Sequence, residues 1–145
     1  MGRKGWYRII NIWNSWTIKN NYPLLLISDL IDSIGKKKMF TKIDLRWRYN
    51  NMRIKEGDEW KAALLMLEEA FEPTVMFFGL TNSLATFQAI MNNLLRDTIG
   101  IGDIVAFIDN IIVETKTEEG HNEIVEEVLR RIKENDLFVK PEKYV

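Results

Sequence analysis

The stretch Ile104–Thr115, with the sequence Ile-Val-Ala-Phe-Ile-Asp-Asn-Ile-Ile-Val-Glu-Thr, decides the fold of this chain. Its two apolar runs, Ile104–Ile108 and Ile111–Thr115, are each of a length that suits a strand. Between them stand Asp109 and Asn110, and both residue types tolerate tight turns. The pattern therefore predicts a β-hairpin that carries an acid at its tip.

The elements around the hairpin follow from hydrophobic periodicity. Asn82 or Ser83 can cap a helix that ends near Gly100. The apolar side chains of this segment fall on one stripe, which is typical of an amphipathic helix. A second amphipathic helix is predicted over Glu118–Glu134. The other elements predicted with it are a strand over Met39–Leu45 before the hairpin and a short strand over Leu137–Lys140 at the end.

The first half of the chain is less regular. Pro23 can open a short helix over Leu24–Ile34, which Gly35 would end. Extended segments are predicted over Trp60–Leu67 and Phe71–Phe78, although the first of them lacks a clear period. Together the elements form the order α β β β α β β α β, which mixes helices and strands in one compact unit.

Composition restricts the class of protein. The chain has 145 residues, of which 46% are hydrophobic, and this suits a single globular domain with a core. It contains no cysteine, so disulfide frameworks and thiolate zinc sites are excluded. No apolar stretch reaches the roughly 20 residues of a membrane span, and the N-terminal residues lack the apolar block of a signal peptide. The sequence predicts an intracellular soluble protein without a membrane partner.

Charge is divided unevenly along the chain. Residues 1–61 contain 13 Lys and Arg against 6 Asp and Glu, whereas residues 62–145 contain 7 against 15. The basic half predicts a surface that faces phosphates. The alternative is that runs such as Lys36-Lys37-Lys38 are ordinary solvated surface.

Two acids stand at the ends of predicted strands. Asp44 closes the strand over Met39–Leu45, and Asp109 lies at the hairpin tip. Carboxylates on adjacent strands can hold Mg²⁺ ions and, through them, the phosphates of a nucleotide. The alternative is that each acid is solvated, as acids at strand ends and turns commonly are.

Seven motifs follow one another in order, and together they carry a family resemblance. They are Tyr22-Pro23-Leu24, Phe40-Thr41-Lys42-Ile43-Asp44-Leu45-Arg46, Tyr49-Asn50, Arg53-Ile54-Lys55, Phe78-Gly79-Leu80-Thr81-Asn82-Ser83, Ala85-Thr86-Phe87-Gln88 and Lys140-Pro141-Glu142-Lys143. From about Thr17 to the end, the chain resembles the reverse transcriptase of gypsy-type LTR retrotransposons. The resemblance implies an RNA-directed DNA polymerase with Mg²⁺ as cofactor. Its implied partners are a primer-template, deoxynucleotides and the rest of a retroelement polyprotein.

The resemblance also implies how the chain is divided. Residues of about 1–38 and 53–75 are expected to be fingers-like, and about 39–52 and 76–145 palm-like. The palm is expected to be an antiparallel sheet with helices on one face. The fingers subdomain would be partial and the thumb absent.

Site residues carry over by resemblance. Asp44 and Asp109 resemble the metal-binding catalytic aspartates, and Tyr49 resembles an aromatic that blocks a ribose 2′-hydroxyl. Lys143 resembles a lysine near the pyrophosphate leaving group, although a solvated terminal lysine is the alternative. The other implied positions are nucleotide-binding Leu45, Arg46, Phe78 and Gly79, and Gln88 on the template side. For Tyr49 and Phe78 the alternative is an aromatic that simply packs.

Departures from the family pattern predict weak or lost activity. Asn110 stands at the position of the second hairpin aspartate, so one carboxylate ligand is replaced by an amide. Arg48 replaces a glycine, Leu84 a proline, and Leu64-Leu65 a Phe-Arg pair. A non-catalytic remnant that binds nucleic acid, or proteins through a tryptophan-rich start, is the alternative function. His121, the only histidine, is expected to lie on the surface.

Overall fold

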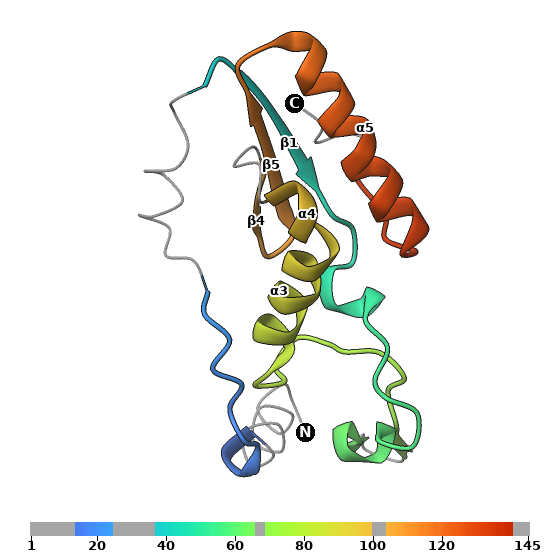
Figure 1. Cartoon of the computed structure of the whole chain (residues 1–145). Coiled ribbons are helices and arrows are strands. Elements are labelled where there is room, and N and C mark those ends of the chain that lie inside the picture. The colour runs from blue at the N-terminus through green and yellow to red at the C-terminus, as the bar shows by residue number, and fades with distance from the viewer. Residues whose placement is uncertain (1–13, 25–36, 66–68, 100–103, 141–145) are drawn as a thin grey trace.

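The computed structural model describes residues 14–24, 37–65, 69–99 and 104–140 (Figure 1). Its main sheet has three antiparallel strands in the order β1-β5-β4. They are β1 (Met39–Asp44), β4 (Ile104–Phe107) and β5 (Asn110–Thr115). The predicted strand before the hairpin is therefore confirmed to within one residue. The predicted helix over Leu24–Ile34 lies outside the described residues from position 25 onward.

The hairpin forms as predicted, but its turn lies one residue earlier. Phe107 pairs with Asn110, so Ile108 and Asp109 form the turn and Asn110 begins β5. Ile108 has a positive φ of 54°, which is uncommon for a β-branched residue. Its N–H donates to Oε1 of Gln88 at 2.7 Å, a contact from another element that fixes the turn at this position.

The segment predicted as one helix from Ser83 forms two helices. The helix α3 (Ser83–Leu94) is capped by Leu95, and the short α4 (Arg96–Ile99) follows it. The helix α5 (Glu118–Glu134) has the predicted bounds. No described helix is both long enough and apolar enough to cross a membrane.

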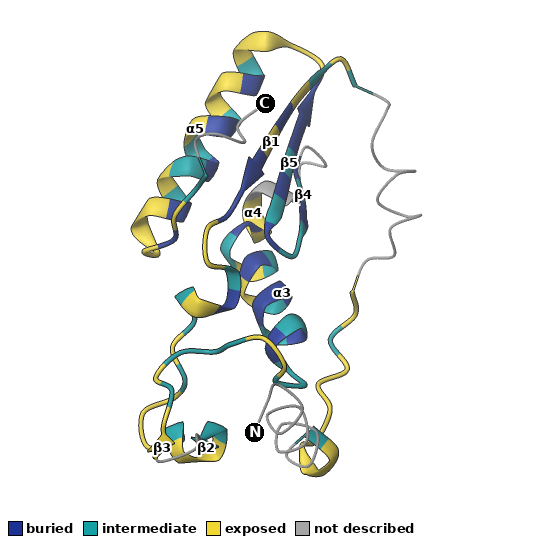
Figure 2. Cartoon of the chain, turned by 180° about the vertical axis from the view of Figure 1, so that it is seen from behind, coloured by how far each residue is buried: buried dark blue, intermediate teal, exposed yellow. Residues whose placement is uncertain are grey.

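The helices cover one face of the sheet. The register places Ile43, Ile111 and Ala106 side by side on that face, and all three are buried with Phe87 of α3 and Val128 of α5. Figure 2 shows buried residues where the helices meet the strands and exposed residues along the outer side of α5. This two-layer α+β arrangement confirms the predicted fold class.

The opposite face of the sheet is more open. Phe40 is 44% exposed, and Lys42 follows it on the same face as an exposed side chain. Farther along this face, Asp44 and Asn110 are directly opposed across β1 and β5. The first predicted acid, Asp44, therefore lies at the end of the face that the helices leave uncovered, and Asp109 lies in the adjoining turn.

The extended segments predicted in the first half are largely wrong. Trp60 lies in a 3₁₀ helix over Glu59–Ala62, and the strands that follow are only β2 (Leu64–Leu65) and β3 (Ala70–Phe71). Between Phe71 and Phe78, only Val75 forms a bridge, with Arg53. The local bonds from Lys61 N–H to Asp58 and from Ala63 N–H to Trp60 explain the helical turn.

The final segment extends the sheet beside β1. Val139 forms an isolated antiparallel bridge with Leu45 where a strand over Leu137–Lys140 was predicted. Arg46 N–H donates to Phe138 O at 2.7 Å, and Lys140 N–H donates to Asp44 O at 2.9 Å. The pairing brings Lys140 next to the first acid.

His121 is buried, so its predicted surface position is wrong. The imidazole is 5% exposed and lies between two threonines, with Nε2 at 2.7 Å from Thr41 Oγ1 and Nδ1 at 2.9 Å from Thr115 Oγ1. Thr115 Oγ1 donates to Thr117 O at 3.0 Å, so it accepts from Nδ1–H. These bonds secure the start of α5 to β1 and β5.

Candidate active site

The structure brings the two predicted acids to one end of the sheet. Asp44 ends β1 opposite Asn110, and Asp109 lies in the adjoining turn. Leu45 N–H donates to Asp109 O at 2.8 Å, which joins the two segments through the backbone. Both acids are buried, at 5% and 3% exposure.

Each acid is paired with a basic side chain. Arg48 Nε lies 2.6 Å from Asp109 Oδ2, and Lys140 Nζ lies 3.4 Å from Asp44 Oδ1. A buried carboxylate needs a counter-charge or strong hydrogen bonds to remain ionised. The two bases provide that charge from different parts of the chain, because Arg48 follows β1 while Lys140 belongs to the final segment.

The backbone that delivers Arg48 is unusual. Trp47 and Arg48 both have positive φ, at 57° and 41°, where the 3₁₀ helix η1 (Arg48–Asn51) begins. Conformations of this kind in non-glycine residues cost of the order of 1–3 kcal/mol each. Surrounding contacts must hold the turn, and the ion pair to Asp109 is one of them.

Gln88 is the residue that positions the hairpin. Its side chain is buried on α3, and Nε2 donates to Ala106 O at 2.8 Å and to Asn92 Oδ1 at 2.9 Å. With the bond from Ile108 N–H to its Oε1, it contacts the backbone on both sides of Phe107. The resemblance placed Gln88 on the template side, and its hairpin contacts were not foreseen from sequence.

Tyr49 packs behind Arg48. Its ring meets those of Phe78 and Phe87 edge-on, with centroids 4.9 and 5.7 Å away. Burial raises the pKa of the phenol above its usual 10.0, while Arg48 lowers it and Asp109 raises it. Phe78 itself is 62% exposed, which does not suit the alternative of a plain core aromatic.

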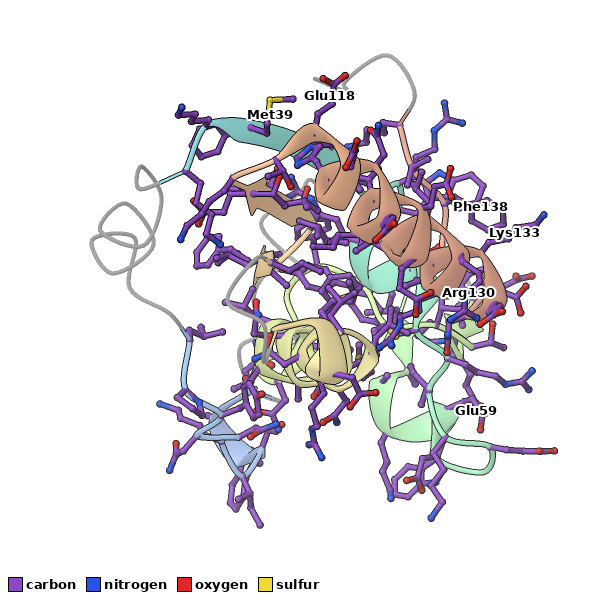
Figure 3. All side chains as sticks on the ribbon, turned by 45° about the horizontal axis from the view of Figure 1, so that its top comes forward. Met39, Glu59, Glu118, Arg130, Lys133 and Phe138 are labelled. Atoms are coloured by element: carbon purple, nitrogen blue, oxygen red, sulfur yellow. The ribbon has the colours of Figure 1, made fainter. Side chains whose placement is uncertain are left out.

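The remaining predicted positions are dispersed. Gly79 has a φ of 108°, and its carbonyl accepts from Asn14 Nδ2 at 2.6 Å. Leu45 is fully buried in the core. Arg46 lines a hollow with Trp47, Lys133 and Phe138, whose lining includes neither acid, and Figure 3 shows Lys133 of α5 near Phe138. Lys143 lies outside the described residues.

Sequence reasoning missed the two counter-ions. Arg48 was noted as a departure from a glycine, and Lys140 as part of a motif, but neither was assigned to an acid. The available signal was that Arg48 stands four residues after Asp44, close enough to fold back onto the site. The distance to Asp109 depends on the hairpin turn and cannot be read from spacing.

The residues at this site do not fit a pair of Mg²⁺ ions. Within the described ranges, no three His, Cys, Asp or Glu side chains gather closely enough to hold a metal. Asp44 and Asp109 already contact internal cations. Asn110 adds a neutral amide, whose NH₂ group cannot face a cation.

An antiparallel sheet with helices on one face and acids at a hairpin tip defines the palm class of nucleic-acid polymerase domains. A family model described as reverse transcriptase (RNA-dependent DNA polymerase) matches residues 5–145. The chain belongs to the reverse transcriptase family, as a domain of the retroelement type.

Relatives agree with this assignment. The chain is 34% identical over 130 residues to the transposon Tf2-7 polyprotein of Schizosaccharomyces pombe, which covers 90% of the chain and 10% of the polyprotein. It is 43% identical over 99 residues to an RNA-directed DNA polymerase homolog of Oenothera berteroana, covering 68% of the chain and 69% of that protein. The chain thus spans about a tenth of the Tf2 polyproteins that it matches.

Solved structures show the same fold. A foamy viral protease–reverse transcriptase in complex with double-stranded DNA superposes with a TM-score of 0.83 at 23% identity, covering 97% of this chain and 24% of the viral chain. The foamy viral enzyme in complex with an RNA/DNA hybrid gives the same TM-score over 96% of this chain and 18% of its own. Within the described residues, the elements account for a palm and part of the fingers, and none forms a thumb.

Proposed function

We propose that this chain is the palm and partial fingers of a gypsy-type LTR retrotransposon reverse transcriptase whose nucleotidyl transfer is impaired in this copy. The proposed division is fingers-like at about 1–38 and 53–75, and palm-like at about 39–52 and 76–145. The identity to a transposon polyprotein over 90% of the chain supports the retroelement origin. The cellular location proposed with it is intracellular.

One observation carries the proposed impairment. Asn110 lies directly opposite Asp44 in the β1–β5 register, at the end of the sheet where the acids meet. An amide offers one neutral oxygen where a carboxylate would offer two charged ones. A reaction that depends on accurately placed divalent ions would lose about 10²- to 10⁴-fold in rate with such a ligand.

The other residues have supporting roles in this proposal. Asp44 and Asp109 are the residues that the resemblance assigns to Mg²⁺, and in this copy the counter-charges of Arg48 and Lys140 oppose metal binding at both. Tyr49, whose ring contacts Phe78, would form the sugar side of a nucleotide site. Gly79, Leu45 and Arg46 are the other nucleotide-binding positions proposed by resemblance. Gln88 would set the hairpin against the template side, and Lys143 would lie near the leaving group.

Nucleic-acid binding is the function proposed to persist without catalysis. The open face of the sheet carries exposed Lys42, and the first 61 residues have an excess of basic side chains. The foamy viral relatives were solved with double-stranded DNA and with an RNA/DNA hybrid. A primer-template and deoxynucleotides are therefore the proposed partners, together with the remainder of a retroelement polyprotein.

Primer extension on an RNA template with Mg²⁺ tests the proposal. We expect no detectable product from the wild-type chain and a gain for Asn110→Asp, with Asn110→Ala as the matched control. The reason is that only the aspartate restores a charged oxygen opposite Asp44. Wild-type extension that Asp44→Ala abolishes would contradict the impairment, as would an Asn110→Asp variant no more active than Asn110→Ala.

A further inference from the structure

Arg48 is held at Asp109 by two side-chain contacts and by the conformation of its own backbone. Its Nε lies 2.6 Å from Asp109 Oδ2, and its guanidinium carbon lies 5.9 Å from the centroid of the Phe78 ring. Its own backbone is in the left-handed region, at a φ of 41°. The carboxylate and the aromatic ring therefore hold the guanidinium beside Asp109, where a bound cation would otherwise lie.

Among the described residues, the charged side chains paired at the two acids balance without a metal. The side chains of Asp109 and Asp44 are 4% and 6% exposed, so water screens them poorly. One guanidinium and one ammonium offset the two carboxylates. A divalent cation entering this site would have to displace a cation that is covalently tethered and therefore always present at high local concentration.

We infer that the guanidinium of Arg48 is a built-in counter-ion that occupies the place of a metal ion at Asp109. A cation then reaches this carboxylate only when Arg48 is released. The inference rests on the proposed function in taking Asp109 as a metal position, and it adds a determinant of cation affinity independent of Asn110. The Arg48 side chain is 42% exposed, so it can swing away without disrupting the core.

Two substitutions remove the charge of Arg48 and are compatible with its positive φ. Asparagine and glycine both adopt positive φ more readily than other residues, so Arg48→Asn and Arg48→Gly impose no new conformation on the turn. Lys42→Gln is the matched control for a general loss of positive charge. Lys42 is an exposed residue of β1 on the same face as Asp44, and in the register it opposes Ile112 instead of an acid.

Manganese binding to the purified chain, followed by the loss of the free-ion electron paramagnetic resonance signal, tests the inference. We expect Arg48→Asn and Arg48→Gly to bind Mn²⁺ at least about tenfold more tightly than the wild type, equivalent to about 1.4 kcal/mol. Lys42→Gln should stay within about twofold of the wild type, because it leaves the Arg48–Asp109 pair intact. Equal affinity of wild type and Arg48→Asn would overturn the inference, as would an equal gain for Lys42→Gln.

A measurement on the wild-type chain covers the case in which the variants fold poorly. The nitrogen-15 resonance of Arg48 Nε–H in the metal-free chain should show the slow exchange of a paired guanidinium. Solvent exchange as fast as that of an unpaired guanidinium contradicts the inference. Neither measurement uses primer, template or nucleotide, so its failure is separate from failure of the proposed function in primer extension.

Discussion

At the scale of single residues, the site is organised by side chains that contact the hairpin from outside it. Gln88 and Arg48 come from α3 and from the segment after β1, and each reaches the turn of Ile108 and Asp109. The sequence predicted that Asp44 and Asp109 lie close together, because both stand at ends of apolar strands. It could not indicate which partners neutralise them, since those contacts depend on tertiary placement.

Substitution of Gln88 should destabilise the hairpin. Gln88→Ala leaves the Ile108 N–H and Ala106 C=O without their partner in a buried position, and it removes packed volume. Each lost partner of this kind costs about 1–3 kcal/mol, so we expect about 2–4 kcal/mol in the free energy of unfolding, measured in urea. Asn93→Ala, an exposed position on the same helix, is the control and should cost under about 1 kcal/mol. Equal losses for the two variants would refute the assigned role.

At the scale of elements, those with a strong period were predictable. The helix α5 shows its predicted bounds because its apolar stripe repeats over four turns and buries Val125, Val128 and Ile132. The hairpin turn was predicted one residue too late because Gln88, 20 residues away from Ile108, fixes it. The segment Trp60–Leu67 lacked a clear period, and local turn bonds decided the form of its first residues.

The outer face of α5 carries a charge cluster that should respond to pH. Glu127 contacts Arg130 at 2.7 Å and Arg131 at 2.6 Å, and the bonds from these arginines hold the pKa of the Glu127 carboxyl at about 2, below its usual 4.5. Because the folded-state pKa is lowered, the stabilisation is fully present above about pH 4.5 and is lost as pH falls toward 2.

Glu127→Gln tests this pH dependence. In urea unfolding, we expect the wild type to be more stable than Glu127→Gln at pH 7 and the difference to disappear as pH falls toward 2. The pair is exposed to water, so added salt should also reduce the difference. Glu126→Gln on the exposed side of the same helix serves as the control and should follow the wild type. A difference that is constant from pH 7 to pH 2 would show that the carboxylate charge is not its source.

At the scale of the whole molecule, the helices cover one face of the sheet, and basic side chains are concentrated in the first half of the chain. We therefore expect the open face to be available to a polyanion. Nucleic-acid binding by a basic surface releases condensed counterions, so the logarithm of the association constant falls linearly with the logarithm of salt concentration. For the purified chain we expect sequence-independent duplex binding whose slope corresponds to a few phosphates, at about −0.9 for each phosphate contacted. Fluorescence anisotropy with a labelled duplex between 50 and 200 mM salt measures this slope.

Lys42→Gln should reduce the slope by about 1 if Lys42 contacts phosphate, whereas Asn110→Ala should leave it unchanged because it alters no charge. Binding that is insensitive to salt would mean that the basic half is ordinary solvated surface. That result would contradict nucleic-acid binding by the open face.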